Sequence, residues 1–242
     1  MINPTIISGM MRSGSTWSHN VTRMILTAVF NNVRVCYANL DDMDQLLDVA
    51  DNTSDFPIIL KAHYPNERAL AGIMSGKYKN IFTYRDPRDC YCSRRSFRPG
   101  EDRMEAIEKV KHSMPYAEVF LTDRNSMCVK YEDITIHDEF TVAKMATYIL
   151  SPADLYLDQK ITDWIAEQVR PNAIKEYIAT FDQLDSIVAD QDHKVDVNTQ
   201  FHDNHITDGR DGRWRTDLLP EDRDMVYNEL NEFAEMLGYD AE

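Results

Sequence analysis

Basic residues are scarce in this chain of 242 residues. It has 26 lysines and arginines against 41 aspartates and glutamates, which gives a formal net charge of -15. Such an acidic surface repels nucleic acid and anionic membranes at long range, so we expect neither as a partner. A strongly anionic substrate is disfavoured for the same reason, unless a local basic site overrides the net charge.

Cysteines are few, and long apolar runs are missing. The four cysteines form no C-x-x-C pair, and no Cys/His cluster has the ligand spacing of a zinc site. We therefore expect reduced thiols and no metal. No signal peptide is recognisable, and no apolar run approaches the length of a membrane span. Together these features predict a cytoplasmic protein.

Short apolar stretches typical of buried strands alternate with stretches of helical periodicity. The strands are expected at residues 5–8, 33–37, 58–60, 80–84 and 127–130. Helices are expected from residue 16, within 41–55, at 104–114 and 140–150, through most of 151–181, and at 220–237. Residues 182–208 are polar and acidic, and we expect a long loop there. The alternation predicts an α/β fold with a central parallel sheet flanked by helices, in one domain covering residues 1–242.

A glycine-containing loop, with the sequence ISGMMRSGSTW from Ile7, joins the first strand to the first helix. Gly9 and Gly14 have the spacing of the phosphate motif G-x-x-x-x-G-K-[ST], but Ser15 stands in place of the lysine. Backbone N–H groups at a helix N-terminus bind anions, and Arg12 adds a fixed positive charge. Hydroxyl donors are expected from Ser13, Ser15 and Thr16. We interpret the loop as an anion site; a turn that only caps the helix is the alternative.

Polar residues follow three other predicted strands. Lys61 and His63 come after the strand at 58–60, Arg85 after that at 80–84, and Tyr131 after that at 127–130. The carboxyl ends of parallel strands meet at one edge of a sheet, where ligands bind. A lone histidine is usually structural, but the place of His63 beside Lys61 at this edge favours a role in proton transfer.

A basic island lies between residues 77 and 103. It holds eight lysines and arginines and four aspartates and glutamates, hence +4 in a chain of -15. A solvated helix face is the simpler explanation. A concentration of positive charge in an acidic protein also suits a small, highly anionic ligand.

These stretches resemble the motifs of the sulfotransferases that use 3'-phosphoadenosine 5'-phosphosulfate (PAPS). RSGSTW from Arg12 is similar to that family's 5'-phosphosulfate loop. YRDPRD from Tyr84, with Ser93 and Phe97, resembles its 3'-phosphate motif. KAHYP from Lys61 resembles the stretch that carries its catalytic histidine.

Two more motifs complete the resemblance. VKYED from Val129 is similar to the family's strand whose tyrosine approaches adenine, and GRDGRWR from Gly209 resembles its C-terminal glycine loop. The five motifs occur in the family's order and extend over most of the chain. Met11 replaces the usual proline, and Thr207 and Asp208 stand where many members have Arg-Lys. Which arginine of the last loop meets the 3'-phosphate is left open among Arg210, Arg213 and Arg215.

The resemblance implies a P-loop-like sulfotransferase. It would move a sulfuryl group from PAPS to a hydroxyl or amine of a small-molecule acceptor, leaving 3'-phosphoadenosine 5'-phosphate (PAP), without a metal. It implies His63 as the base and Arg12 and Lys61 as the residues that stabilise charge. The implied donor-binding residues are Arg12, Ser13, Gly14, Ser15, Thr16, Trp17, Arg85, Ser93, Tyr131, Gly209, Arg210, Gly212 and Arg213.

Within that set the resemblance implies distinct roles. Arg85 and Ser93 would hold the 3'-phosphate, and Trp17 and Tyr131 would contact adenine. The family's Ser-Phe adenine contact has no clear counterpart between Trp164 and Tyr177, where Val169-Arg170-Pro171 stands instead. Variable loops at 39–56, 97–103 and 182–205 would line the acceptor site, and their acidity favours a neutral or cationic acceptor.

Two other functions stay open at this point. A P-loop small-molecule kinase or nucleotide hydrolase fits the glycine spacing, but the lysine and a clear metal-binding aspartate are missing. A catalytically inactive nucleotide-binding homologue fits the altered Thr207 and Asp208, whereas the presence of Arg12, Lys61 and His63 argues against it. The identity of the acceptor and the oligomeric state cannot be inferred from these patterns.

Overall fold

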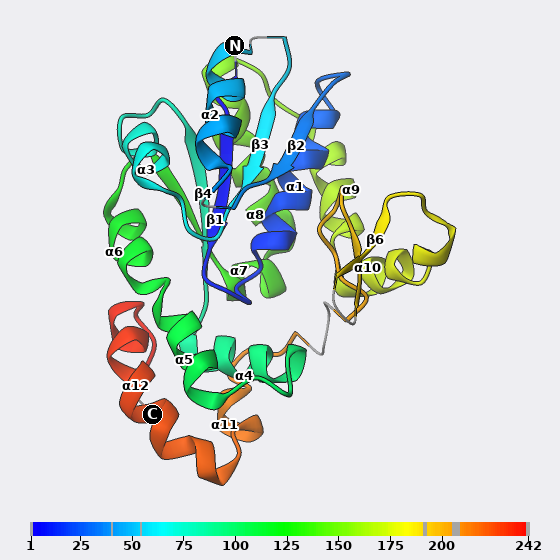
Figure 1. The fold of residues 1–242 in the computed structure, drawn as a ribbon. Coiled ribbons are helices and arrows are strands. Elements are labelled where there is room, and N and C mark those ends of the chain that lie inside the picture. Colours follow the sequence, from blue (N-terminus) through cyan, green and yellow to red (C-terminus); the bar gives the residue numbers. More distant parts are fainter. Residues whose placement is uncertain (1, 40, 54, 191–192, 205–208, 241–242) are drawn as a thin grey trace.

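Five parallel strands form the central sheet within the residues that this computed structural model describes, which are 2–39, 41–53, 55–190, 193–204 and 209–240. The spatial order is β2-β3-β1-β4-β5. The strands are β1 (Thr5–Gly9), β2 (Arg34–Tyr37), β3 (Ile58–Lys61), β4 (Lys79–Tyr84) and β5 (Ser126–Lys130). Helices cover both faces of the sheet (Figure 1). The predicted parallel α/β fold is confirmed.

The side chains of the central strands alternate between two cores. Ile6 and Leu60 pack into one core, and their chain neighbours Ile7 and Ile59 pack into the other. Successive side chains of a strand point to opposite faces, so a strand covered on both faces is apolar throughout. This is why the strands could be recognised as short continuous apolar runs.

Each core is covered by its own set of helices. The first core takes residues from α2 (Met43–Asn52), α3 (Glu67–Met74), α4 (Pro87–Phe97), α5 (Arg103–Lys111), α6 (Met114–Thr122), α11 (Trp214–Asp217) and α12 (Pro220–Met236). The second takes residues from α1 (Ser15–Thr27), α7 (Tyr131–Ile136), α8 (Asp138–Leu150) and α9 (Gln159–Gln168). The chain also forms α10 (Pro171–Ile178) and the 3-10 turns η1 (Ser151–Ala153) and η2 (Phe181–Gln183).

Two local expectations were wrong. The helix expected at 104–114 ends at Lys111, and α6 begins at Met114 with Pro115 in its first turn, where a missing N–H is tolerated. Residues 187–190 and 193–196 pair as the antiparallel strands of a hairpin, β6 (Ile187–Asp190) and β7 (His193–Asp196), within the stretch that was expected to be a loop. Each strand has only four residues and is largely unburied, so neither shows the alternation that marks a half-buried strand.

The hairpin, which lies to the side of the sheet near α10 in Figure 1, is anchored by the turn that follows it. Asp196 is fully buried, and its carboxylate accepts hydrogen bonds from Tyr177 Oη at 2.6 Å and Thr199 Oγ1 at 2.5 Å. The backbone N–H of Asn198 donates to the same carboxylate at 3.1 Å. Asn20 of α1 donates to the Thr199 carbonyl at 2.8 Å. These bonds attach the turn and the hairpin to α1.

Replacing the buried carboxylate, Asp196→Ala, leaves its donors without an acceptor. We expect the free energy of unfolding to fall by about 2–3 kcal/mol, measured by urea denaturation at neutral pH. Burial raises the pKa of Asp196, but the bonds from Thr199 and Tyr177 outweigh it and lower the pKa overall. The stabilisation is therefore present above the ordinary aspartate pKa and is lost as pH falls through the lowered value.

The control is Asp203→Ala, which removes an exposed carboxylate that contacts His193 Nδ1 at 3.1 Å. It should change stability by less than about 0.5 kcal/mol. Equal effects of the two variants would contradict the anchoring role of Asp196.

Candidate active site

The register of the central strands brings the predicted strand ends together. The strand order reverses around β1, which lies between β3 and β4. Ile7 is paired with Lys61, and Gly9 is paired with Thr83. The glycine loop, Lys61 and the start of α4 therefore leave the sheet at the same edge, which is where open α/β sheets bind ligands.

The glycine loop is held in an uncommon backbone conformation. Arg12 has a φ of 65° and Gly14 a φ of 94°, both in the left-handed region. A Cβ at Gly14 would lie 2.8 Å from Ile134 Cδ1, so the loop can approach α7 closely only with glycine here. Left-handed non-glycine residues concentrate at functional sites, where the surrounding structure holds them.

Ser13 does not serve as the hydroxyl donor that the sequence suggested. Its side chain is fully buried, and its Oγ lies 2.7 Å from the Met10 carbonyl oxygen and 2.9 Å from that of Thr83. The hydroxyl therefore ties the loop to β4 and points into the sheet. Gly14, Ser15 and Thr16, in contrast, line a cavity at the start of α1.

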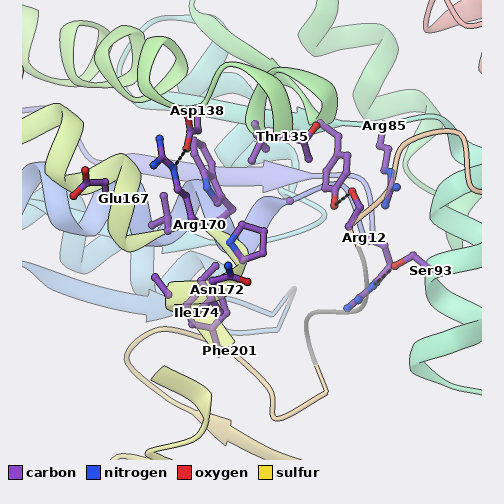
Figure 2. A pocket seen from close by; sticks show the side chains of 18 of the residues that line it. Arg12, Arg85, Ser93, Thr135, Asp138, Glu167, Arg170, Asn172, Ile174 and Phe201 are labelled. Carbon is purple, nitrogen blue, oxygen red and sulfur yellow. Dashed lines mark hydrogen bonds and ion pairs between the residues drawn. The ribbon is translucent and has the colours of Figure 1, made fainter. Parts of the chain in front are cut away.

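Two cavities meet at the glycine loop. The first cavity has a volume of about 880 Å³ and extends from the loop toward α7 and α10. Figure 2 shows Arg12, Arg85 and Ser93 gathered at one end of it and Asp138, Glu167 and Arg170 at the other. Its lining includes the predicted residues Arg12, Gly14, Trp17, Arg85, Ser93, Tyr131 and Gly209 and the stretch 169–171.

The cationic end of the first cavity is tightly organised. Arg12 Nε donates to Ser93 Oγ at 3.1 Å, so the loop and α4 are in direct contact. The Arg85 guanidinium lies 3.9 Å from the centre of the Tyr131 ring and donates to Asp89 at 3.2 Å. Arg85 Nε is buried and has no hydrogen-bond partner among the described residues. An arginine with an unsatisfied buried N–H beside a cavity is suited to bind an anion.

The C-terminal glycine loop forms hydrogen bonds with Arg85 and with its partner Asp89. The Arg210 carbonyl accepts a hydrogen bond from Arg85, and the N–H groups of Gly212 and Trp214 donate to Asp89 at 2.8 and 2.9 Å. Of the four donor-binding residues predicted here, Gly209 lines the first cavity, whereas the other three do not.

The arginine side chains of this loop are directed to a carboxylate instead. Arg210 donates to Asp217 at 3.1 Å, and Arg213 does so at 2.9 Å. Both ion pairs draw the guanidinium groups toward α11. The altered positions Thr207 and Asp208 lie outside the described residues.

The second cavity, of about 570 Å³, lies on the other side of the loop and shares Arg12 and Gly14 with the first. Lys61 and His63 line it, together with a wall formed by the hairpin. Its lining residues are Met11, Arg12, Gly14, Ser15, Thr16, Tyr37, Lys61, His63, Arg94, Phe97, Val188, Ala189, Asp190, Val195, Gln200 and His202. Two of the three loops expected to line an acceptor site therefore contribute to this lining. They are 182–205, through several residues, and 97–103, through Phe97 alone. No described residue of 39–56 lines the cavity.

Lys61 is 5% exposed, and its Nζ donates to Thr16 Oγ1 at 2.7 Å. Burial, reinforced by the charge of Arg12, lowers the pKa of Lys61 to about 7. Burial disfavours the charged ammonium, and a second cation nearby disfavours it further. Lys61 is therefore poised between its charged and neutral forms near neutral pH.

His63 is held in one tautomer. Its Nδ1 lies 2.9 Å from the Gly9 carbonyl oxygen, which can only accept, so Nδ1 carries the hydrogen and Nε2 keeps a free lone pair. Burial, followed by the charges of Lys61 and Arg12, lowers the pKa of His63 to about 4. The imidazole is thus neutral at physiological pH and able to accept a proton at Nε2.

Sequence reasoning missed several lining residues. Tyr37 ends strand β2 and lies 5.9 Å, ring centre to Nζ, from Lys61. Its position at the carboxyl end of a predicted strand was a usable indication. Asp190 and His202 lie within the stretch 182–205 that was expected to line the acceptor site, but the sequence did not single out these two residues. The structure brings them to the cavity where β6 pairs with β7.

A parallel α/β sheet with an anion loop at its switch point and a cationic, histidine-bearing cavity is the architecture of a group-transfer enzyme acting on a phosphate-containing ligand. The sulfotransferase domain family matches the chain over residues 3–229. The chain belongs to this family, which confirms the predicted class of enzyme. No curated protein sequence matches it significantly.

Solved structures of low sequence identity share the fold. A retinol dehydratase in complex with androsterone and the inactive cofactor PAP matches with a TM-score of 0.64 at 15% identity, over 95% of this chain and 80% of that one. A complex of retinol dehydratase with retinol and PAP gives 0.61 at 14% identity, over 96% and 82%. A mouse sulfotransferase complexed with PAP gives 0.63 at 13% identity, over 98% and 88%.

The described residues contain neither a helix that could span a membrane nor a cluster of metal ligands. None of the helices in that part of the chain has both the length and the apolar composition needed to cross a membrane. No group of three or more His, Cys, Asp or Glu side chains is arranged there to hold a metal ion. The expectation of chemistry without a metal stays a prediction.

The lowered pKa of Lys61 predicts a pH-dependent stability. Between the ordinary value of 10.5 and about 7, the unfolded chain holds a proton that the folded chain does not, so stability falls as pH falls through this window. Lys61→Met removes this effect. We expect the melting temperature of the variant to rise relative to the natural protein from pH 10 to pH 7 and the difference to level off below.

Scanning calorimetry across this pH range measures the difference. Lys144→Met, at an exposed lysine of α8, is the control, and its difference from the natural protein should stay constant. A constant difference for Lys61→Met would contradict the burial of a titrating ammonium.

Proposed function

We propose that the first cavity binds PAPS and that the second cavity binds a small-molecule acceptor whose hydroxyl or amine receives the sulfuryl group. One observation carries this proposal: the cavities share Arg12 and Gly14, while Lys61 and His63 line the second. A donor in one cavity and an acceptor in the other would meet at the glycine loop, beside a fixed charge and a base.

The residues of the first cavity fit the donor. Its cationic end offers Arg12, Arg85 and the N-terminus of α1 to phosphate and sulfate groups, and the buried Nε of Arg85 lacks a described partner. Ser93 adds a hydroxyl at the same end. Trp17 and Tyr131 line the cavity and provide aromatic surface for adenine. The direct bond between Arg12 and Ser93 supports a 5'-phosphosulfate site adjacent to the proposed 3'-phosphate site.

The chemistry follows from the placement of three side chains. PAPS supplies the sulfuryl group when it is bound. Nε2 of His63 takes the proton of the attacking hydroxyl, because Nδ1–H is fixed on the Gly9 carbonyl. Arg12 and Lys61 stabilise the negative charge that grows on the leaving side. Alignment of the reacting groups contributes up to about 7–11 kcal/mol of barrier reduction.

Donor binding and base strength are coupled. The cations Lys61, Arg12 and Arg94 contribute to lowering the pKa of His63, after burial itself. An anion at the glycine loop offsets these charges, which raises the pKa of both His63 and Lys61. The site thus gains a stronger base and a charged Lys61 only when the donor is present.

The alternatives are less well supported. A kinase or nucleotide hydrolase is disfavoured by family membership, because the matched family transfers sulfate groups. An inactive homologue would need neither the fixed tautomer of His63 nor a buried Lys61. Their hydrogen bonds to Gly9 and Thr16 hold both side chains at one cavity, which supports an active enzyme.

Three further expectations belong to this proposal. The donor cavity takes residues from Arg12 to Gly209, which supports one domain over residues 1–242. All four cysteines are free thiols, which supports a reducing compartment such as the cytoplasm. Structural neighbours hold androsterone and retinol, which supports a small-molecule acceptor of comparable size.

His63→Ala should lower turnover by roughly 10²–10⁴-fold while PAP affinity changes little, because the side chain lines only the second cavity. Transfer of labelled sulfate from PAPS to a panel of phenols and alcohols measures turnover, and calorimetry with PAP measures binding. His112→Ala, at a histidine of the α5–α6 junction, is the control. Full activity of His63→Ala would remove this residue as the base.

Arg85→Ala should weaken PAP binding by about tenfold or more, because a charge-assisted contact is lost. The affinity for adenosine 5'-phosphosulfate, which lacks the 3'-phosphate, should fall far less. Arg95→Ala is the matched control, since Arg95 lies on the adjacent helix α4, donates to the Glu101 carbonyl and lines neither cavity. Equal losses for the two nucleotides would contradict a 3'-phosphate contact by Arg85.

A further inference from the structure

The hairpin places a carboxylate on the wall of the second cavity. Asp190 ends β6 and is the one acidic side chain among the described residues that line this cavity. The glycine-loop side, in contrast, carries Arg12, Lys61 and His63. The cavity therefore has a cationic side, where the donor would lie, and a separate acidic position on the hairpin.

The charge of Asp190 is only weakly compensated. Its nearest described cations are His202, with Nδ1 at 3.6 Å from Oδ2, and Arg98, with Nη2 at 4.0 Å. Both distances exceed that of a normal hydrogen bond. Burial lowers the pKa of His202, which makes it a poor counter-ion at neutral pH. The carboxylate is 41% exposed and can accept a further hydrogen bond.

The rest of the wall suits an apolar, ring-shaped body. Phe97 lies with its ring 4.5 Å from the Arg12 guanidinium, and Tyr37, Val188 and Val195 complete this part of the lining. The positive charge of Arg94, the other cation on this cavity, is shared with Glu101 through an ion pair. A ligand with a reactive hydroxyl, an apolar middle and a cationic end would match these three regions.

We propose that Asp190 selects acceptors that carry a protonated amine at the end remote from the reacting hydroxyl. This selection rests on the proposed function, since it takes the second cavity as the acceptor site. The cationic end avoids Lys61 and Arg12 and meets the carboxylate, whereas an acceptor with a carboxylate there meets repulsion. Because Asp190 is partly exposed, the contribution is on the order of fivefold in affinity rather than a hundredfold.

Binding to the preformed enzyme–PAP complex tests the assignment. Calorimetry at pH 7.4 and low ionic strength compares three phenols that share a para two-carbon chain: tyramine, which ends in an ammonium, 4-ethylphenol, which is uncharged, and 3-(4-hydroxyphenyl)propionate, which ends in a carboxylate. We expect affinity to fall in that order. In Asp190→Asn the preference for tyramine over 4-ethylphenol should disappear, and high salt should reduce it in the natural protein.

Matched variants separate the outcomes. Asp203→Asn removes a nearby carboxylate that does not line the cavity and should keep the preference. PAP affinity reports whether each variant is folded, and Asp190→Ser provides a second replacement. If PAP does not bind the natural protein, the proposed function itself fails. If PAP binds but tyramine is not preferred, or is preferred equally by the Asp190 variants, the role of Asp190 is overturned; failure of all three phenols to bind overturns it as well.

Discussion

The pairing of β1 with β3 on one side and β4 on the other is the constraint on which the site depends. It puts Lys61 level with Ile7 and Thr83 level with Gly9, so the glycine loop leaves the sheet between the two strands that supply its neighbours. A slip of one residue would turn the alternating Ile6 and Ile7 to the wrong cores. The same apolar alternation that holds the sheet together therefore fixes the position of the glycine loop and of Lys61 at its edge.

Positive charge is concentrated at this edge although the chain as a whole is strongly acidic. Burial lowers the pKa of Arg12 to about 10, of Lys61 to about 7 and of His63 to about 4. The charge of Arg12 contributes to the lowered pKa of Lys61, and both cations contribute to that of His63, so positive charges at this edge repel one another. An anionic ligand offsets this repulsion, so part of its binding free energy comes from reducing the repulsion among the side chains.

The strands and the edge that carries the site could be predicted because both follow from local patterns. Buried parallel strands are short apolar runs, and the residues that follow them, such as His63 and Arg85, lie at one edge by topology alone. The hairpin at 187–196 could not be predicted, because exposed strands carry little apolar alternation. Nor could the inward turn of the Ser13 hydroxyl or the pairing of Arg213 with Asp217, which depend on contacts between distant segments. Motifs indicate which residues are present at the site, but only packing decides which atoms face the ligand.

Arg12 belongs to the walls of both cavities, and its bond to Ser93 fixes it between them. In the proposed function, in which each cavity binds one ligand, a group in that position couples the two binding equilibria. If one ligand changes the affinity for the other through Arg12, the second ligand changes the affinity for the first by the same factor, whichever binds first. Arg12, which lies between the cavities, would thus be the residue through which binding in one cavity changes the affinity of the other.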